Sequence, residues 1–166
     1  MKMQLIQPFI SAADCVLASA LGGPAKIGDL SMEQDDYRRK GCAARVVITG
    51  EIEGRIIVDM APETAVRIAT VLAGEEVKES DQVVSETVFE LANMIIGNAV
   101  TLLNDHGHQF KVLPPEHHRD SENPGSNTER EETAIYFDTP CGRVFLNISM
   151  RYNLRSRAEH IPALSR

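Results

Sequence analysis

Tryptophan is absent from the sequence, and aromatic residues make up only 5% of it, so an aliphatic core must carry the fold. No uninterrupted apolar run reaches the roughly 18 residues that a membrane span requires. The apolar N-terminal stretch is interrupted at helical spacing by Gln4, Gln7, Ser11 and Asp14, which argues against a signal peptide. We therefore expect a cytoplasmic protein without a membrane partner.

Motifs for redox, metal and nucleophilic chemistry are also missing. The three cysteines are widely spaced and form no CxxC pair, and their odd number fits a reducing compartment: Cys15, Cys42 and Cys141. The sequence has no Gly-rich phosphate loop, no GxSxG motif and no HExxH motif. Four histidines lack metal-ligand spacing and are interpreted as surface residues: His106, His108, His117 and His118. We expect no metal and no other cofactor on this chain.

Positive charge is scarce: the sequence has 17 Lys and Arg residues and 24 Asp and Glu residues, for a net charge of -7. Nucleic-acid binding needs clustered Lys and Arg, so no nucleic-acid partner is expected. Basic residues do gather near the C-terminus, but without interleaved aromatics, which indicates a solvated tail: Arg151, Arg155, Arg157 and Arg166.

The 166 residues have the size of one ordinary domain, which we assign to residues 1–166. Hydrophobic periodicity and Gly/Pro stop signals predict the elements in order. They are a helix over 8–21, a hairpin of strands 44–49 and 55–60, a helix over 62–72, a long helix over 82–105, a strand over 109–113, and a hairpin of strands 134–138 and 143–150. The polar segment 116–132, which contains Pro and Gly, is predicted to be a mobile loop.

This order predicts an α+β fold, with an antiparallel or mixed β-sheet and helices packed on one face. A helix followed by strands occurs twice, which indicates two pseudo-repeated halves, although their sequences barely match.

The long helix separates cleanly into two faces at about 100° per residue. The predicted core arc contains Val84, Val88, Leu91, Ala92, Ile95, Ala99, Leu102 and Leu103. The opposite arc contains Glu86, Glu90, Asn93, Gly97 and Asn104. Glu90 and Asn93 are three residues apart, so their side chains should lie next to each other and point away from the core.

Gly97 is unusual on this exposed arc, because a glycine inside a helix costs about 1 kcal/mol relative to alanine. A bare helix surface beside Glu90 and Asn93 would let another protein approach closely. The alternative is a solvated face with one tolerated glycine, and spacing alone favours that alternative.

The stretch ELANMIIGNA, residues 90–99, resembles the active-site helix of the CheC/CheX/FliY family of chemotaxis phosphatases, whose signature is Glu-x-x-Asn followed by Gly. The resemblance extends over most of the chain. It includes QPFISAADCVLASALG, ITGEIEGRIIVDMAPETAVRIATVLAGEEV and GRVFLNISM. The first helix lacks a second Glu-x-x-Asn, so the chain is more similar to CheX than to CheC, with one active face and a CheC-like fold.

The resemblance implies an enzyme that hydrolyses the phosphoaspartate of a CheY-like response regulator in chemotaxis or another two-component pathway. Asn93 would orient the attacking water, Glu90 would pair with a cation on the receiver, and Glu86 and Gly97 would belong to the docking surface. Mg²⁺ is expected in the partner receiver. Family members pair as homodimers through their sheets, which implies a homodimer here.

One residue departs from the family pattern, because Glu86 stands where relatives often have Asp or Ser four residues before the signature Glu. Asn98 lies at a different helical angle and is assigned a structural role. The alternative function is a non-enzymatic adaptor of the same fold that binds receivers or dimerises. A flagellar-switch component similar to FliY is less favoured, because no extra domain is present.

Overall fold

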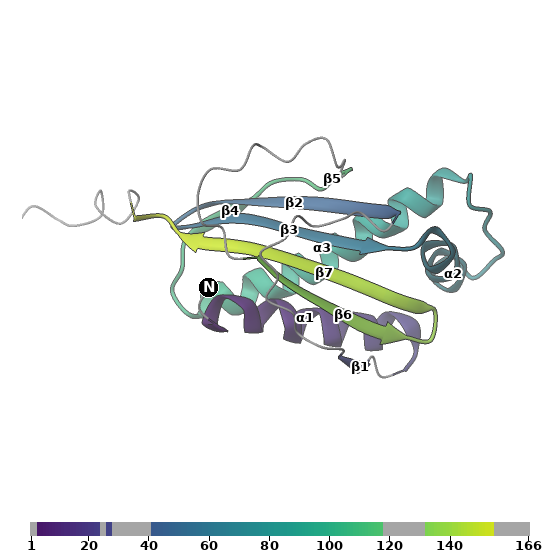
Figure 1. The fold of residues 1–166 in the computed structure, drawn as a ribbon, viewed down its shortest axis with the longest axis horizontal. Helices are drawn as coiled ribbons and strands as arrows, with labels where there is room; N and C mark the ends of the chain where they lie inside the picture. The colour runs from purple at the N-terminus through teal and green to yellow at the C-terminus, as the bar shows by residue number, and fades with distance from the viewer. Residues whose placement is uncertain (1–2, 24–25, 28–40, 118–131, 155–166) are drawn as a thin grey trace, which may run out of the picture.

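The computed structural model describes residues 3–23, 26–27, 41–117 and 132–154, which form three helices and a seven-stranded sheet (Figure 1). The helices are α1 (Met3–Leu21), α2 (Pro62–Ala73) and α3 (Gln82–Asp105). The strands are β1 (Lys26–Ile27), β2 (Cys42–Gly50), β3 (Ile52–Met60), β4 (Phe110–Val112), β5 (Glu116–His117), β6 (Glu132–Thr139) and β7 (Gly142–Tyr152).

The sheet has the order β1-β6-β7-β3-β2-β4, and β5 also pairs with β2. Every pairing is antiparallel, which confirms the predicted α+β class. The two predicted hairpins are β2–β3 and β6–β7, and their second strands meet at the centre. There β3 pairs with β7 along its whole length, from Ile52 opposite Tyr152 to Met60 opposite Val144.

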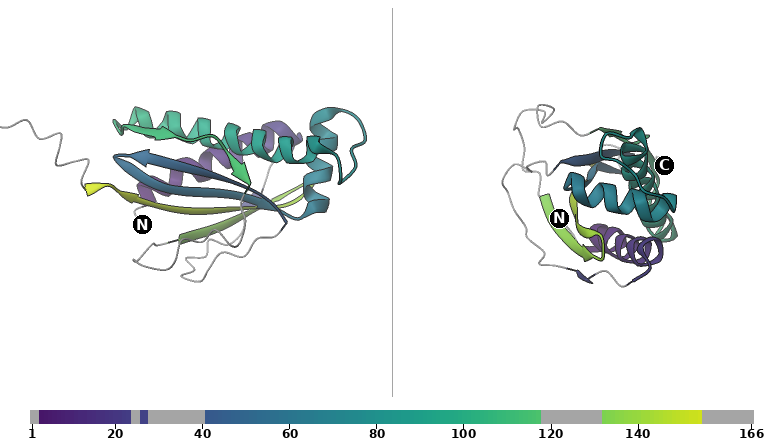
Figure 2. Two further views of the ribbon diagram at one scale, coloured as in Figure 1. Left: turned by 90° about the horizontal axis from the view of Figure 1, so that it is seen from above. Right: turned by 90° about the vertical axis from the view of Figure 1, so that its right-hand side faces the viewer.

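The helices cover one face of the sheet, as predicted, with α1 and α3 side by side and α2 at one end (Figure 2). Helix α3 packs against β2 and β3, whereas α1 contacts β6. Each long helix therefore packs under the hairpin of the other half. The two pseudo-repeated halves interlock, so neither could bury its helix without the other.

The core lies between the helices and the inner face of the sheet. Alternate residues of the central strands point toward the helices, as the two-residue period of a strand requires. The inner face contributes Val46, Ile48, Ile56, Val58, Met60, Ile135, Phe137, Val144, Leu146 and Ile148, all at most 2% exposed. Each large aliphatic side chain buried in this way contributes about 1.5–3 kcal/mol. The expected aliphatic core is present, with Phe9 and Phe137 as its fully buried aromatic residues.

Gly54 explains how the central strands come so close together. A Cβ added there would lie 2.0 Å from the backbone oxygen of Ser149 on β7. The φ angle of +158° adds strain for any other residue. Glycine is therefore required where β3 and β7 pair.

Helix α1 begins at Met3, five residues before the predicted start at Pro8, and Pro8 lies inside it. Leu5 and Ile6 are buried in the core, and their burial extends the helix toward the N-terminus. The missing N–H of Pro8 removes only one early backbone hydrogen bond. The strand signal of Lys26–Ile27 is too short to detect from sequence, and β1 was not predicted.

The predicted bounds of the loop 116–132 are wrong at both ends, because Glu116 and His117 form β5 and Glu132 begins β6. Beyond β4 the edge of β2 continues, and β5 pairs there with Ala44 and Arg45. The Nε of Arg45 also donates to the Glu116 carboxylate at 2.8 Å. Residues 118–131 lie outside the described part of the chain.

Helices α1 and α3 are long and apolar enough, by length and composition, to cross a membrane. Both bury their apolar side chains against the sheet and each other, and core helices of a folded domain commonly meet the same criterion.

Candidate functional site on helix α3

Helix α3 is a rigid support of 24 residues with the bounds that the sequence predicts. At its start, the backbone carbonyl of Asp81 accepts a hydrogen bond from the N–H of Val84 at 3.1 Å. The Asp81 carboxylate accepts the N–H of Lys78 at 2.9 Å, which orders the preceding turn. At its end, Gly107 has a φ of +84°, which only glycine adopts without strain.

The buried stripe of α3 fixes the rotation of the helix about its axis. Nine of its residues are buried, and they recur every three or four positions: Val84, Thr87, Val88, Leu91, Ala92, Ile95, Ile96, Ala99 and Leu103. Two of these, Thr87 and Ile96, were not assigned to the core from sequence. Leu102 was assigned to the core wrongly and is 38% exposed, because it borders an open groove between the start of α1 and the end of α3.

Glu86, Glu90, Asn93 and Gly97 are all exposed on the opposite side of α3. Glu90 and Asn93 are neighbours at i and i+3 on this surface. Within the described part of the chain, neither side chain forms a hydrogen bond or an ion pair. Both are therefore available to a partner. We call the surface formed by these four residues the α3 face.

Gly97 leaves the α3 face open. A Cβ added at this position would meet no heavy atom within 4 Å. Its carbonyl oxygen accepts a hydrogen bond from the Thr101 hydroxyl at 3.0 Å, which involves the backbone and not a side chain. Packing within the described residues therefore does not require glycine here. That Gly97 lets another protein approach the helix closely stays a prediction.

The α3 face is acidic. The helix carries Glu86, Glu90 and Asp105 and contains no Lys or Arg. A negatively charged surface of this kind favours a partner that presents a cation.

Met94 adds an apolar group to this acidic surface and was missed by the sequence reasoning. It is 39% exposed and lies one turn after Glu90 and three residues before Gly97. Its position as an apolar residue next to the predicted polar arc could have indicated that it belongs to this surface. Exposed methionine suits a binding surface, because its flexible thioether side chain adapts to different shapes.

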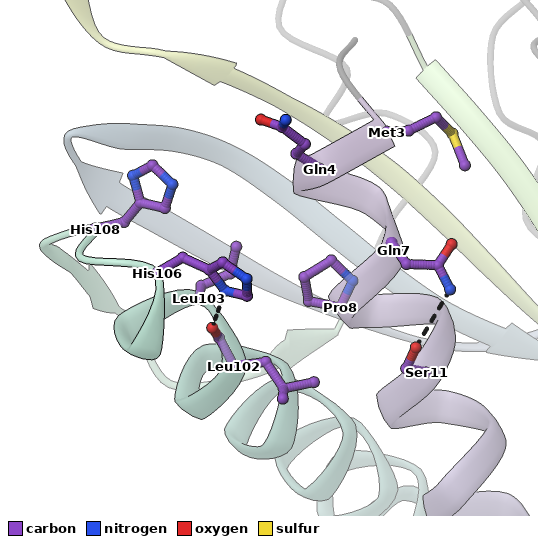
Figure 3. A pocket seen from close by; sticks show the side chains of 9 residues that line it. All are labelled: Met3, Gln4, Gln7, Pro8, Ser11, Leu102, Leu103, His106 and His108. Atoms are coloured by element: carbon purple, nitrogen blue, oxygen red, sulfur yellow. Dashed lines mark hydrogen bonds between the residues drawn. The ribbon is translucent and has the colours of Figure 1, made fainter.

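An open hollow lies away from Glu90 and Asn93. It is an open groove of about 680 Å³ between the N-terminal part of α1 and the end of α3 (Figure 3). Within it, Gln7 donates to the Ser11 hydroxyl at 3.3 Å, and the ring of His106 bonds the carbonyl of Leu102. From Asn93 to Leu102 the helix rises about 14 Å. Its lining residues include no Asp, Glu, Lys, Arg or Cys.

Two of the histidines contact different aromatic rings. The ring of His108 lies 5.8 Å from that of Tyr152, and the ring of His117 lies 4.5 Å from that of Phe89. His118 lies outside the described residues. Among residues 3–23, 26–27, 41–117 and 132–154, no group of three His, Cys, Asp or Glu side chains is placed to hold a metal ion.

Burial raises the pKa of the Cys141 thiol, with a smaller opposing effect of Arg67, so this thiol is a poor nucleophile.

Comparison with known proteins identifies a family. The family model described as "Chemotaxis phosphatase CheX" matches residues 42–138, more than half of the chain. The chain is 25% identical to the CheY-P phosphatase CheX of Thermotoga maritima over 116 residues, which cover 69% of this chain and 75% of that protein.

Solved structures agree with this result. A CheC-like superfamily protein from Shewanella sp. PV-4 matches with a TM-score of 0.78 at 22% identity, covering 91% of this chain and 99% of that one. The CheX-CheY-BeF3-Mg²⁺ complex from Borrelia burgdorferi matches with a TM-score of 0.72 at 32% identity, covering 88% of this chain and 97% of that one.

Replacing Gly97 with alanine should stabilise the fold, because the added methyl group meets open space and alanine is the better helix former. We expect the free energy of unfolding to rise by about 1 kcal/mol. Urea denaturation followed by circular dichroism measures this difference. A loss of stability in Gly97→Ala would show that the glycine serves the fold.

Proposed function

The chain belongs to the chemotaxis phosphatase CheX family, and from this premise we propose that it hydrolyses the phosphoaspartate of a CheY-like response regulator. The observation that carries the proposal is that Glu90 and Asn93 are exposed neighbours on a helix whose rotation is fixed by its buried stripe. Among the described residues, neither side chain forms a hydrogen bond or an ion pair. The Thermotoga relative is a CheY-P phosphatase, and the Borrelia relative was crystallised with CheY, BeF3 and Mg²⁺.

The proposed reaction is attack of water on the phosphorus of the acyl phosphate. The bond between phosphorus and the aspartyl oxygen breaks, and the products are the free aspartate carboxylate and inorganic phosphate. An acyl phosphate is already reactive, and the receiver supplies Mg²⁺ and a lysine to offset the charge of the phosphoryl group. The missing component is a water molecule held in line with the breaking bond, because correct positioning alone accelerates such reactions greatly.

Asn93 suits this positioning role. Its amide offers one acceptor oxygen and two donor hydrogens, so it can hold water at a defined angle. It is neutral and not basic, and this mechanism requires no general base. Because α3 packs against β2 and β3 over several turns, the amide enters the receiver site on a rigid support.

The other members of the α3 face are assigned to docking. The carboxylate of Glu90 pairs with the receiver lysine and fixes the angle at which Asn93 enters, since charge-assisted hydrogen bonds are short and directional. Glu86 adds negative charge on the same side. Gly97 leaves room for the receiver surface one turn beyond Asn93.

A pocket on this chain is not needed for such a reaction. The phosphoryl group sits in the receiver, and the α3 face is a projecting surface that completes the receiver site. This arrangement accounts for the distance between the predicted catalytic pair and the groove in Figure 3.

The second candidate function is that of an adaptor that binds receivers without hydrolysis. The acidic α3 face with exposed Met94 supports binding as well as catalysis. Measuring binding and turnover on the same receiver separates the two, because an adaptor binds the phosphorylated receiver and leaves its lifetime unchanged.

Replacing Asn93 with alanine should abolish phosphatase activity, because the water loses its positioning group. We expect kcat to fall by roughly 10²-fold or more with little change in receiver affinity. Loss of radiolabel from a phosphorylated receiver gives the rate, and calorimetry gives the affinity. Asn104→Ala is the matched control, since Asn104 is exposed on the same side of α3 about three turns later. Equal rates for Asn93→Ala and the parent protein would refute the assignment.

Glu90→Ala should weaken both docking and turnover, because it removes the proposed ion pair with the receiver lysine. We expect receiver affinity to fall by roughly tenfold or more, in line with a charge-assisted hydrogen bond. Glu63→Ala is the control, since Glu63 is an exposed carboxylate in the first turn of α2. Unchanged affinity and rate in Glu90→Ala would contradict the docking role.

We also propose that the chain forms a homodimer through its sheet. In the described residues, β1 pairs with β6 only at Phe137 and Asp138. The earlier part of β6, from Glu132 to Tyr136, has no described partner on that edge, and an open edge can pair with a second copy. Sedimentation equilibrium should give about twice the chain mass of 18.3 kDa. A single-chain mass at micromolar concentrations would contradict the dimer.

A further inference from the structure

A small hollow of about 150 Å³ lies between α3 and strands β2 and β5, on the flank of α3 that is turned away from α1. We call it the α3–β5 hollow. Its lining residues are Cys42, Ala43, Ser85, Val88, Phe89 and His117.

One wall of the hollow is formed by residues of α3 that lie in the same row as Asn93. Ser85, Phe89 and Asn93 follow one another at intervals of four residues, so they form a single row along the helix surface. The first two members line the hollow, and the third is the proposed catalytic residue. The hollow therefore begins one helical turn from Asn93, on the same side of α3.

The opposite wall is β5, which is held in place by contacts with α3 and β2. The ring of His117 lies 4.5 Å from that of Phe89 at an interplanar angle of 49°. His117 also pairs with Ala44 of β2, and the next pair joins Glu116 to Arg45. The ion pair between Arg45 and Glu116 fixes this short strand further. These contacts make the hollow a formed feature of the surface.

The lining determines what the hollow can receive. It contains no carboxylate and no Lys or Arg, and its polar groups are the Ser85 hydroxyl, the Cys42 thiol and the His117 ring. A volume of about 150 Å³ accommodates one apolar group of roughly the size of benzene. Glu86 follows Ser85 in sequence and is exposed, but it is not one of the lining residues. The lining therefore suits an uncharged side chain.

We propose that the α3–β5 hollow receives one apolar side chain of the receiver that docks on the α3 face, and that Phe89 and His117 thereby select among receivers. The inference rests on the proposed function and assigns it a specificity site. In an apolar pocket, one methylene group more or less changes selection by roughly 10- to 200-fold. Asn93 and Glu90 act at the phosphoryl group and the lysine, which receivers share. The hollow contacts a side chain that can differ between receivers.

The first test fills the hollow. Ser85→Leu should raise KM for the phosphorylated receiver by about tenfold or more and leave kcat within about twofold, because the reacting groups are untouched. Ser19→Leu introduces the same side chain at an exposed position of α1 and should behave as the parent protein. An unchanged KM in Ser85→Leu, or a fall in kcat alone, would overturn the proposal.

The second test locates the receiver directly and needs no variant. A beryllofluoride-loaded receiver should slow alkylation of Cys42, which lines the hollow, by a small maleimide. Cys15 is an internal control, because it is exposed on α1, on the other side of α3. Equal slowing of both thiols, or of neither, would contradict occupation of the hollow.

The two proposals can fail separately. If the parent protein binds the receiver without accelerating dephosphorylation, and Ser85→Leu weakens that binding, the phosphatase proposal is wrong and the hollow is supported. If the parent protein is active and Ser85→Leu matches it in KM, the hollow is refuted and the phosphatase proposal stands. If the parent protein neither binds nor dephosphorylates any receiver, both are refuted.

Discussion

Burial of the apolar stripe of α3 against β2 and β3 is the constraint on which the rest of the structure depends. Nine side chains between Val84 and Leu103 are buried, and they leave the helix no freedom to rotate about its axis. The direction of every other side chain on α3 follows from that packing. Glu90 and Asn93 are exposed because Leu91, Ala92 and Ile95 are in the core.

The interlocked halves make this support rigid. Helix α3 precedes the β6–β7 hairpin but packs under β2 and β3, and α1 precedes the β2–β3 hairpin but contacts β6. The close approach of β3 and β7 at Gly54 joins the hairpins at the centre of the sheet. A side chain that must position water benefits from such a base, because misplacement by about 1 Å can cost roughly 100-fold in rate.

Most of the fold follows from local patterns in the sequence. The bounds of α3 and the presence of both hairpins could be predicted, because hydrophobic periodicity and Gly or Pro boundaries are local signals, although each hairpin strand is longer than predicted. The start of α1 and strand β5 could not. Met3–Gln7 is helical because Leu5 and Ile6 join a core built by distant strands, and β5 exists because the edge of β2 is available.

The same distinction applies to the functional site. Exposure of Glu90, Asn93 and Gly97 could be predicted from spacing, whereas their assignment to phosphatase chemistry required the resemblance to a family. The error at Leu102 arose because the helical wheel assumes that a core extends along the whole helix, whereas a groove opens at the end of α3. The hollow beside Asn93 brings Cys42, Phe89 and His117 together from three elements, and no single stretch of sequence contains it.

The most direct test of the account is a crystal structure of this chain bound to a beryllofluoride- and Mg²⁺-loaded receiver. In this complex we expect the Asn93 side chain to enter the receiver site, with its amide within about 3.2 Å of the in-line water or of a fluoride. We also expect the Glu90 carboxylate to contact the receiver lysine. A receiver bound to another face of the chain, or an Asn93 amide facing solvent in the complex, would contradict the central claim.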